Sequence, residues 1–435
     1  MIKIRNLRLG TILITLFLFA CSSRHDRNNT SFVHTHHLQL IDSTGHPLLL
    51  HGINLMDKTA EGGYFVGVNQ AAFDSIAAWG MNAVRLGIFW AGIEPHPGVI
   101  DTAYLKELDR RIAMAEKAGV YVLLDMHQDL YSEKYNGDGA PDWACLDEGQ
   151  PNIAKGSSWD DAYFSSPAIQ TAFDNFWNNK KADDSIGLQD HYAHAWSVIA
   201  ERYKNDPSVL GYDIMNEPFI GSPIQQVMQQ YFKVLLDTLK SKKDSPVQTG
   251  KQLMALWLSE SGRAKIMGML SDVPLFKAVM DATEDIYAKY EETQLQPFYD
   301  RVFEAIHKVD TNHLLFLEPS VSANIGVKSH LRNKYGRYMV YAPHTYDIVT
   351  DTKHQAAFSK GRLTLILKRH AVTQHRLNVP MVMGEWGAFY GADSSIIPQA
   401  KFIMHKMDSL KCGSFYWAYQ KDLRKRSYFG VLSRE

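Results

Sequence analysis

Residues 103–126 read AYLKELDRRIAMAEKAGVYVLLDM, and they contain the unit that decides the fold. The first part has the apolar spacing of an amphipathic helix and ends at Gly119, a residue type that commonly stops a helix. Asp101 or Thr102 can cap this helix at its N-terminus. The second part, 120–126, is a short apolar run that is typical of a strand buried on both faces. The stretch therefore predicts a helix followed by a strand of a parallel sheet.

This alternation of helix and strand continues along the chain. Eight apolar runs are expected to be strands: 48–54, 82–88, 120–126, 210–215, 313–318, 338–343, 380–385 and 413–417. Amphipathic segments expected to be helices lie between them, and they are 71–80, 103–119, 189–204, 298–309, 356–378 and 396–411. Eight strands alternating with helices predict an α/β fold, a (β/α)8 TIM barrel. A hairpin near 37–51, around Ser43-Thr44-Gly45, is expected to cover the bottom of the barrel.

Two connections are too long to be ordinary loops. Residues 127–188 follow the third apolar run, and residues 218–297 follow the fourth. Connections that follow strands emerge on the catalytic face of such a barrel, so both insertions should lie over that face. The second insertion has helical patterns at 226–240 and 252–293, and it is rich in Met and Leu. Helices packed on the barrel rim would explain this composition, and so would a flexible lid that contacts an apolar ligand.

The N-terminal segment resembles an export signal. Three basic residues precede an apolar run at 9–20, which ends at Cys21. The run is too short to span a bilayer comfortably, and the pattern predicts a signal peptide at 1–21. Leu18-Phe19-Ala20-Cys21 resembles the lipobox of bacterial lipoproteins, which makes Cys21 the expected lipidation site. A plain cleaved signal is the alternative, and the polar residues 22–36 are expected to form a tether.

The composition indicates an ordinary globular protein. The chain has 435 residues, of which 45% are hydrophobic and 21% are charged, and its net charge is −1. This charge gives no reason to expect a nucleic-acid partner. Residues 37–435 are interpreted as a single domain, and a monomer is expected. Cys145 and Cys412 could pair in an exported protein or remain buried thiols. No metal-ligand spacing is present, so neither a metal nor another cofactor is predicted.

Two carboxylates follow apolar runs at the expected C-terminal rim. Glu217 lies in the run Asp213-Ile214-Met215-Asn216-Glu217-Pro218, and Glu385 lies in Met383-Gly384-Glu385-Trp386. Glycoside hydrolysis needs two carboxylates in one cleft, one as the acid and the other as nucleophile or base. Glu217 is the predicted acid/base, with a pKa raised by partial burial beside a second carboxylate. Glu385 is the predicted nucleophile, kept ionised by hydrogen-bond donors.

Other strand ends carry polar or aromatic residues suited to the same chemistry. The whole set is Arg85, His127, Asn216, Glu217, His344, Tyr346, Glu385 and Trp417. Arg85 and Tyr346 can hydrogen-bond the nucleophile, because a guanidinium and a phenol both donate to carboxylates. Asn216 can bind the sugar 2-hydroxyl, and Trp417 offers a flat apolar face to the ring. His127 and His344 are expected to bind sugar hydroxyls or to tune Glu217.

This set resembles glycoside hydrolase family 5, and within it the endoglycoceramidases. The most specific strings are Leu124-Asp125-Met126-His127-Gln128-Asp129 and Gly137-Asp138-Gly139-Ala140-Pro141-Asp142-Trp143-Ala144, joined by Gly52–Lys58 and Pro343–Asp347. The resemblance implies that Lys58, Asp125 and His127 contact the sugar beside the scissile bond. It also implies that the insertion 218–297 faces ceramide and a membrane surface. Those enzymes usually carry a β-sandwich after the barrel, which is not expected here: either the eighth helix is abbreviated or the sequence is truncated.

Three functions remain in competition. The first is a retaining endo-β-glycosidase that cuts between the glycan and ceramide of glycosphingolipids, in the cell envelope or secreted. The second is an endo-β-1,4-glucanase or mannanase that acts on polysaccharide with the same two glutamates. The third is a non-catalytic glycan-binding surface lipoprotein. The apolar stretch 253–280 favours a lipid substrate, and the presence of both glutamates favours an enzyme.

Overall fold

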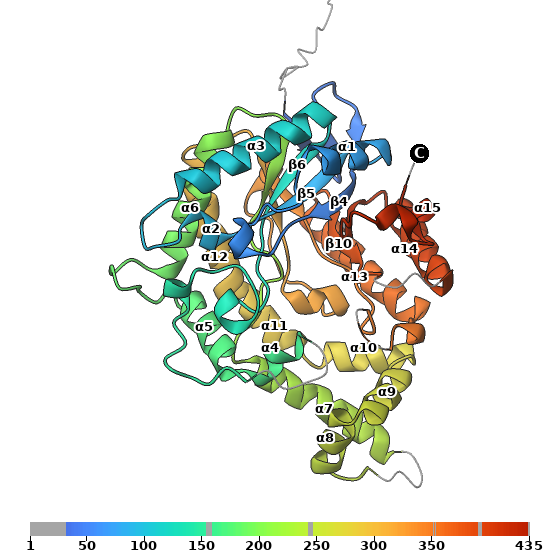
Figure 1. Ribbon diagram of the computed structural model, residues 1–435. Helices are drawn as coiled ribbons and strands as arrows, with labels where there is room; N and C mark the ends of the chain where they lie inside the picture. The colour runs from blue at the N-terminus through green and yellow to red at the C-terminus, as the bar shows by residue number, and fades with distance from the viewer. Residues whose placement is uncertain are drawn as a thin grey trace, which may run out of the picture.

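A barrel of eight parallel strands forms the centre of the molecule (Figure 1). The computed structural model describes residues 32–153, 159–241, 247–350, 352, 354–389 and 394–433. The barrel strands are β4 (His51–Leu55), β5 (Ala83–Ile88), β6 (Tyr121–Met126), β7 (Val209–Asp213), β8 (Leu314–Leu317), β9 (Met339–Tyr341), β10 (Val382–Gly387) and β11 (Gly413–Trp417). They are hydrogen-bonded in the order β10-β11-β4-β5-β6-β7-β8-β9. Parallel bridges Tyr341–Met381 and Thr345–Trp386 join β9 to β10. The predicted (β/α)8 barrel is confirmed.

Helices surround the barrel, most of them where the amphipathic pattern predicts them, and two short helices, 90–93 and 429–432, lie outside the predicted segments. They are α1 (Gln70–Ala78), α2 (Trp90–Ile93), α3 (Thr102–Ala118), α6 (Leu188–Tyr203), α12 (Gln296–His307), α13 (Lys360–Leu377), α14 (Ile397–Ser409) and the short α15 (Phe429–Leu432). Short 3-10 turns at η1 (Ala60–Gly62), η5 (Val321–Ile325), η6 (Gly336–Tyr338), η8 (Ser394–Ile396) and η9 (Leu423–Lys425) complete the connections.

Capping residues set the ends of these helices. Asp101, rather than Thr102, caps α3: its carboxylate accepts hydrogen bonds from the backbone N–H groups of Ala103 and Tyr104. Gly119 ends α3 with φ 71°, in the left-handed region that favours glycine. The helix predicted at 356–378 starts later, because Ser359 caps α13 and the preceding η7 (Gln355–Ala357) is a separate 3-10 turn.

A small antiparallel sheet covers the bottom of the barrel, as predicted. It consists of β1 (His34–His36), β2 (Gln39–Ile41) and β3 (Pro47–Leu48). Beneath it lies one buried cluster of apolar residues from this sheet, from the barrel strands and from the residues beside them: Val33, Leu40, Leu50, Ala83, Leu123, Leu210, Leu314, Phe316, Val340, Ala342, Val382 and Phe415. The polar tether predicted at 22–36 is wrong for residues 34–36, because they pair with β2 in register His34–Ile41.

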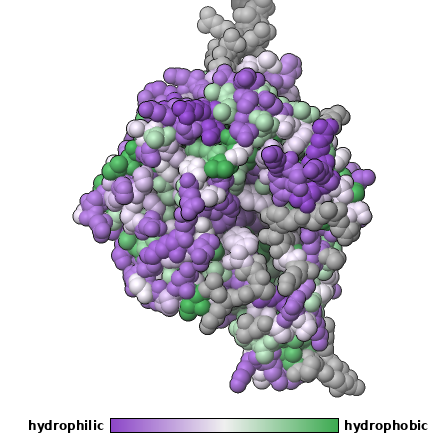
Figure 2. Space-filling view, in the orientation of Figure 1, coloured by the Kyte–Doolittle hydropathy of each residue, from purple (hydrophilic) through white to green (hydrophobic). Residues whose placement is uncertain are grey.

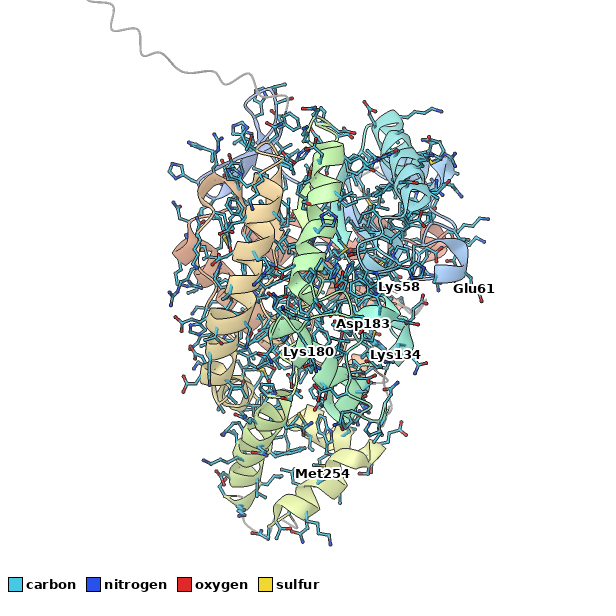
Figure 3. The ribbon with its side chains drawn as sticks, turned by 90° about the vertical axis from the view of Figure 1, so that its left-hand side faces the viewer. Lys58, Glu61, Lys134, Lys180, Asp183 and Met254 are labelled. Carbon is cyan, nitrogen blue, oxygen red and sulfur yellow. The ribbon has the colours of Figure 1, made fainter. Side chains whose placement is uncertain are left out.

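The two long insertions contain helices of their own. The first holds η2 (Glu133–Tyr135), η3 (Asp142–Ala144), α4 (Asp161–Ser165) and α5 (Pro167–Trp177). The second holds α7 (Ile224–Lys240), α8 (Gly250–Leu258), α9 (Glu260–Met269), α10 (Val273–Asp281), α11 (Glu284–Tyr290) and the π-helix η4 (Glu291–Leu295). Helices α8 and α9 lie at the end of an arm that extends away from the barrel (Figures 1 and 3).

Packing accounts for many of the apolar residues in the second insertion. Leu253, Ile266 and Phe276 are buried in the large core. Met254 is an exception, because it is 42% exposed and lies on the arm in Figure 3. The face seen in Figure 2 is mostly hydrophilic, with hydrophobic residues in small separate patches. The insertion therefore buries several of its apolar residues in the large core, and the arm at α8 and α9 adds an exposed methionine.

Both cysteines in the described part of the chain are buried free thiols. Burial raises the pKa of Cys145 and of Cys412 to about 12, so both sulfurs remain protonated at neutral pH. Within the described residues, no helix combines the length and apolar character needed to cross a bilayer. The predicted signal peptide and Cys21 lie outside the described residues.

Candidate active site

Arg85 lies at the centre of a buried group of carboxylates inside the barrel. It is on β5 and is fully buried. Its Nε donates to Asp213 at 2.8 Å, and its Nη2 lies 2.8 Å from Asp125 and 2.9 Å from Glu318. Its Nη1 donates to Glu385 at 2.9 Å. These carboxylates raise the pKa of Arg85 well above its usual value despite burial, so the guanidinium is a permanent charge that orients them.

Glu217 follows β7 in a constrained conformation. Its φ of 47° lies in the left-handed region, which is uncommon for a residue with a side chain. Its backbone N–H donates to Glu318 Oε2 at 2.9 Å, which holds the turn. The carboxylate Oε1 accepts hydrogen bonds from Asn324 Nδ2 and from His344 Nδ1, each at 2.9 Å. The side chain is 16% exposed, so Glu217 is open to a ligand while its orientation is set by two donors.

Glu385 lies on β10 and has donors on both oxygens. Oε1 accepts from Arg85, and Oε2 accepts from the Tyr346 hydroxyl at 2.9 Å. His344 Nδ1 lies 3.5 Å from the same Oε2. Burial nevertheless raises the pKa of Glu385 to about 7, because the loss of solvation outweighs the charges of His344 and Arg85. The expected donors are therefore in place, and part of the Glu385 population is protonated at neutral pH.

His344 lies between the two glutamates. Its Nε2 is 3.0 Å from Glu318 Oε1, and the ring is fully buried. Burial lowers the pKa of His344, but the carboxylates of Glu318, Glu385 and Glu217 raise it well above the usual value. The imidazole is thus a cation at neutral pH that donates from Nδ1 to Glu217.

The spacing of the two glutamates indicates the stereochemical class. One carboxylate oxygen of Glu217, one of Glu385 and a ring nitrogen of His344 all lie within 4.8 Å of one another. Retaining glycosidases have carboxyl groups about 5–5.5 Å apart, whereas inverting enzymes need roughly 6.5–9.5 Å to admit a water. A pair of carboxylate oxygens no more than 4.8 Å apart fits the retaining class.

A second group of polar residues lies beside the glutamates. His127 Nδ1 lies 2.8 Å from Asp125, and carboxylates of Asp125 and Asp129 raise the pKa of His127 to about 10 against the effects of burial and of Lys58. The ring of Trp417 stacks on His127 at 5.5 Å between centroids and 18° between planes. Lys58 Nζ lies 4.9 Å from the centre of the Trp417 ring. The chain after β4, the chain after β6 and the end of β11 thus bring a cation, an imidazole and an indole together.

Two clusters in the described chain have the composition of metal ligands. They are His127, Asp129 and Asp138, and Glu217, His344 and Glu385. Lys58 forms an ion pair with Asp129 and lies 3.5 Å from Asp138, and Arg85 contacts Glu385. Protein cations therefore already neutralise both clusters.

The structure brings the predicted site residues together. The contacts just described, and others that adjoin them, involve these predicted residues: Lys58, Arg85, Asp125, His127, Asn216, Glu217, His344, Tyr346, Glu385 and Trp417. Asn216 accepts from Arg85 Nη2 at 3.0 Å and donates to the Gln128 carbonyl at 3.1 Å. Arg85, Asp125 and Asp213 lie within strands rather than after them.

Sequence reasoning missed two residues that hold Glu217. Glu318 ends the predicted run 313–318, so its position at a strand end was an available signal. Asn324 lies in the turn η5, where nothing in the local pattern marks it. Its Oδ1 accepts a hydrogen bond from the His344 backbone N–H at 3.2 Å, so Asn324 contacts both Glu217 and His344.

Comparisons with known proteins agree with this geometry. The chain matches the family "Cellulase (glycosyl hydrolase family 5)" over residues 41–249 and 277–422. An endoglycoceramidase of Cyanea nozakii is 34% identical over 210 residues, covering 42% of this chain and 41% of that protein. Endoglycoceramidase I of Rhodococcus hoagii is 34% identical over 186 residues, covering 42% and 36%. The chain thus spans less than half the length of these relatives.

A solved structure resembles the fold over most of the chain. Endo-glycoceramidase II from Rhodococcus sp. superposes with a TM-score of 0.68 and 25% identity, covering 90% of this chain and 80% of that one. The family match covers most of the barrel, including both glutamates. The chain belongs to glycosyl hydrolase family 5.

Proposed function

We propose that this protein is a retaining endo-β-glycosidase that hydrolyses the linkage between the glycan and the ceramide of glycosphingolipids. The proposal rests on one observation: a carboxylate oxygen of Glu217, which follows β7, lies within 4.8 Å of a carboxylate oxygen of Glu385, which is in β10. Relatives named endoglycoceramidases support the substrate class.

The first step forms a glycosyl–enzyme ester. A carboxylate oxygen of ionised Glu385 attacks the anomeric carbon, and the bond from that carbon to the ceramide oxygen breaks. Glu217 gives its proton to the departing oxygen, so ceramide leaves as a neutral alcohol. Arg85 and Tyr346 hold the Glu385 carboxylate through one hydrogen bond each, and therefore fix the direction of attack.

The second step releases the glycan. Glu217, now a carboxylate, takes a proton from water while the water oxygen attacks the anomeric carbon and the bond to Glu385 breaks. Two inversions restore the β configuration, and both glutamates return to their starting states. His344 donates from Nδ1 to Glu217 at 2.9 Å, and this contact holds the carboxyl group in place between the steps.

Residues beside the glutamates are suited to hold the sugar. Trp417 offers an apolar face to the ring, and Lys58, Asp125, His127 and Asn216 supply polar groups. The buried contacts of His127 with Asp125 and with the Trp417 ring fix its orientation before a ligand arrives. Preorganisation of this kind lowers the entropy cost of binding.

Attachment to a membrane is part of the proposal. The enzyme acts as a monomer in the bacterial envelope, anchored through lipidated Cys21 or secreted, with the arm of the 218–297 insertion toward the lipid. The exposed Met254 supports this orientation, since an apolar side chain there would contact ceramide or acyl chains.

A polysaccharide substrate is the alternative. The family description names cellulases, and mannan endo-1,4-beta-mannosidase 5 of Arabidopsis thaliana is 25% identical over 201 residues. An endo-β-1,4-glucanase or mannanase would use both glutamates in the same roles.

One incubation separates these functions. Purified protein is given a ganglioside, lactosylceramide and carboxymethylcellulose in parallel, and the products are separated. We expect intact oligosaccharide and free ceramide from the two lipids. Sugar release from the cellulose alone would favour the alternative, and no release from any substrate would favour a binding protein. Glu385→Gln is the control, because it keeps the shape of the side chain and removes the nucleophile.

A further inference from the structure

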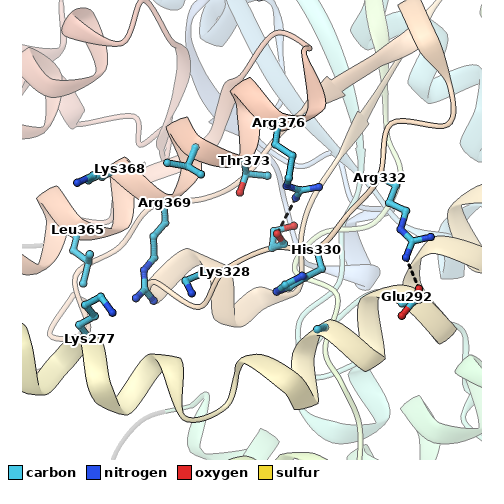
Figure 4. Close-up of a pocket in the computed structure, with 13 residues that line it drawn as sticks. Lys277, Glu292, Lys328, His330, Arg332, Leu365, Lys368, Arg369, Thr373 and Arg376 are labelled. Carbon is cyan, nitrogen blue, oxygen red and sulfur yellow. Dashed lines mark hydrogen bonds and ion pairs between the residues drawn. The ribbon is translucent and has the colours of Figure 1, made fainter.

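A basic groove lies outside the active site, between two parts of the chain that are distant in sequence (Figure 4). Helices α10 and α11 and the π-helix η4 form one wall, and α13 forms the other. The loop 328–332 lies between them. The cavity has a volume of about 510 Å³, enough for a phosphate group with its attached glycerol.

The floor of the groove is built before any ligand binds. Arg376 on α13 donates to the carbonyl oxygens of Leu331 and Ser329 at 2.7 and 2.9 Å. From below, buried Glu291 accepts hydrogen bonds from the Ser329 hydroxyl and from the His330 backbone. The loop is therefore held from both sides, and the side chains it carries have fixed starting points.

Positive charge exceeds negative charge around this floor. Six Lys and Arg side chains line the cavity: Lys277, Lys328, Arg332, Lys368, Arg369 and Arg376. Their acidic partners among the described residues are Asp281, Glu284 and Glu292. Arg376 uses its donors on carbonyl groups, which do not cancel its charge. This excess contrasts with a net charge of −1 for the whole chain.

Individual residues show the same excess. Asp281 accepts ion pairs from Lys277 and Arg369 and lies 3.9 Å from Lys328, and these cations lower its pKa despite burial. Lys368 has no ion-pair partner among the described residues. Next to it on α13, Val372 is 60% exposed, so the rim of the groove also offers an apolar contact.

We propose that this groove binds a phosphate group, presented by an anionic phospholipid at the surface where the protein works. Several cations around a preformed floor suit a multiply coordinated phosphate, and an exposed apolar rim suits the acyl region beside a headgroup. A soluble phosphate would use the same cations without the rim. The site is separate from the glutamates, so it holds the protein on the lipid surface and takes no part in bond cleavage.

The test compares the parent chain with two double variants of the full chain, and all three proteins carry Cys21→Ser to prevent acylation. K328Q/K368Q removes two cations from the groove. K106Q/K117Q removes two exposed cations from α3, so both proteins have the same net charge. Each is sedimented with phosphatidylcholine vesicles, with and without phosphatidylglycerol, and the midpoint of thermal unfolding is measured with and without inorganic phosphate. The vesicles contain no glycolipid, so the result does not depend on the proposed hydrolysis.

We expect the parent protein and K106Q/K117Q to bind vesicles that contain phosphatidylglycerol, and K328Q/K368Q to bind roughly 20- to 30-fold more weakly. A second outcome is that inorganic phosphate stabilises the parent but not K328Q/K368Q, and that the parent does not bind vesicles. This outcome would assign the same site to a soluble phosphate. Equal behaviour of both double variants toward vesicles and phosphate would overturn the proposal. The single variant Lys368→Gln serves if the double variant is poorly folded, since this lysine has no ion pair to lose in the described structure.

Discussion

At the residue scale, the site is organised by one buried cation. Arg85 contacts Asp125, Asp213, Glu318 and Glu385, and each of these carboxylates is held in one orientation by that contact. Burying an ion pair costs solvation free energy. Removing one partner destabilises the fold more strongly, because the other charge is then buried without compensation. In this site, the contact with Arg85 fixes the position of the nucleophile Glu385 relative to the acid Glu217.

Glu217→Ala tests the assignment of the acid. We expect hydrolysis of natural glycolipid to fall by about 10²–10⁴-fold, because the departing ceramide oxygen no longer receives a proton. Azide should restore turnover of an activated aryl glycoside, whose leaving group needs no acid. Rates are measured by product release, with Glu304→Ala on the exposed side of α12 as the control. Normal hydrolysis of glycolipid by Glu217→Ala would show that another group is the acid.

Tyr346→Phe tests the control of the nucleophile. The Tyr346 hydroxyl stabilises ionised Glu385, whose pKa is about 7. Loss of this donor should raise that pKa further, so the fall in kcat/KM at acidic pH should begin at a higher pH than in the parent. The measurement is the pH profile of kcat/KM, with Tyr121→Phe at the barrel bottom as the control. An acidic limb at the same pH in Tyr346→Phe would mean that this limb does not report Glu385.

At the element scale, local pattern and capping explain most of the helices. The helical spacing of α3 was evident, and its ends follow from Asp101 and Gly119. The late start of α13 is also local, because Ser359 accepts from the Arg362 N–H. The arm at α8 and α9 is different: its pattern predicted helices, but which apolar side chains are buried depends on what packs against them.

Asp101→Ala tests the cap of α3. Two backbone donors lose their acceptor, so we expect the free energy of unfolding to fall by about 1 kcal/mol. Asp101→Asn should retain most of the stability, and Thr102→Ala should leave it nearly unchanged, because Thr102 lies inside the helix and is not the cap. Denaturant unfolding measures all three. A larger loss for Thr102→Ala than for Asp101→Ala would contradict the assignment.

At the scale of the whole molecule, folding into the barrel changes the protonation of His127. His127 has a pKa of about 10 in the folded protein, against 6.5 for an unperturbed histidine. The folded state therefore binds this proton more tightly than the unfolded state. The resulting stabilisation is fully present below pH 6.5 and is lost as pH rises toward 10.

The expected slope is a loss of about 1.4 kcal/mol of unfolding free energy per pH unit across that window. The check is the difference in stability between the parent and His127→Gln, measured from pH 6 to 9.5. The difference should shrink as pH rises, whereas groups elsewhere contribute equally to both proteins and cancel. A difference that stays constant with pH would mean that His127 is neutral in the folded protein.

The sequence by itself determined the eight strands, the helices between them and both glutamates. Burial on both strand faces imposes continuous apolar runs, and a polar side chain at the end of such a run must face the rim. Only the tertiary structure decided that Glu318 and Asn324 hold Glu217, that residues 34–36 join a sheet, and that six cations meet in one groove. Each of these depends on contacts between segments far apart in the chain, and local periodicity carries no information about such contacts because it records only which side of an element is buried.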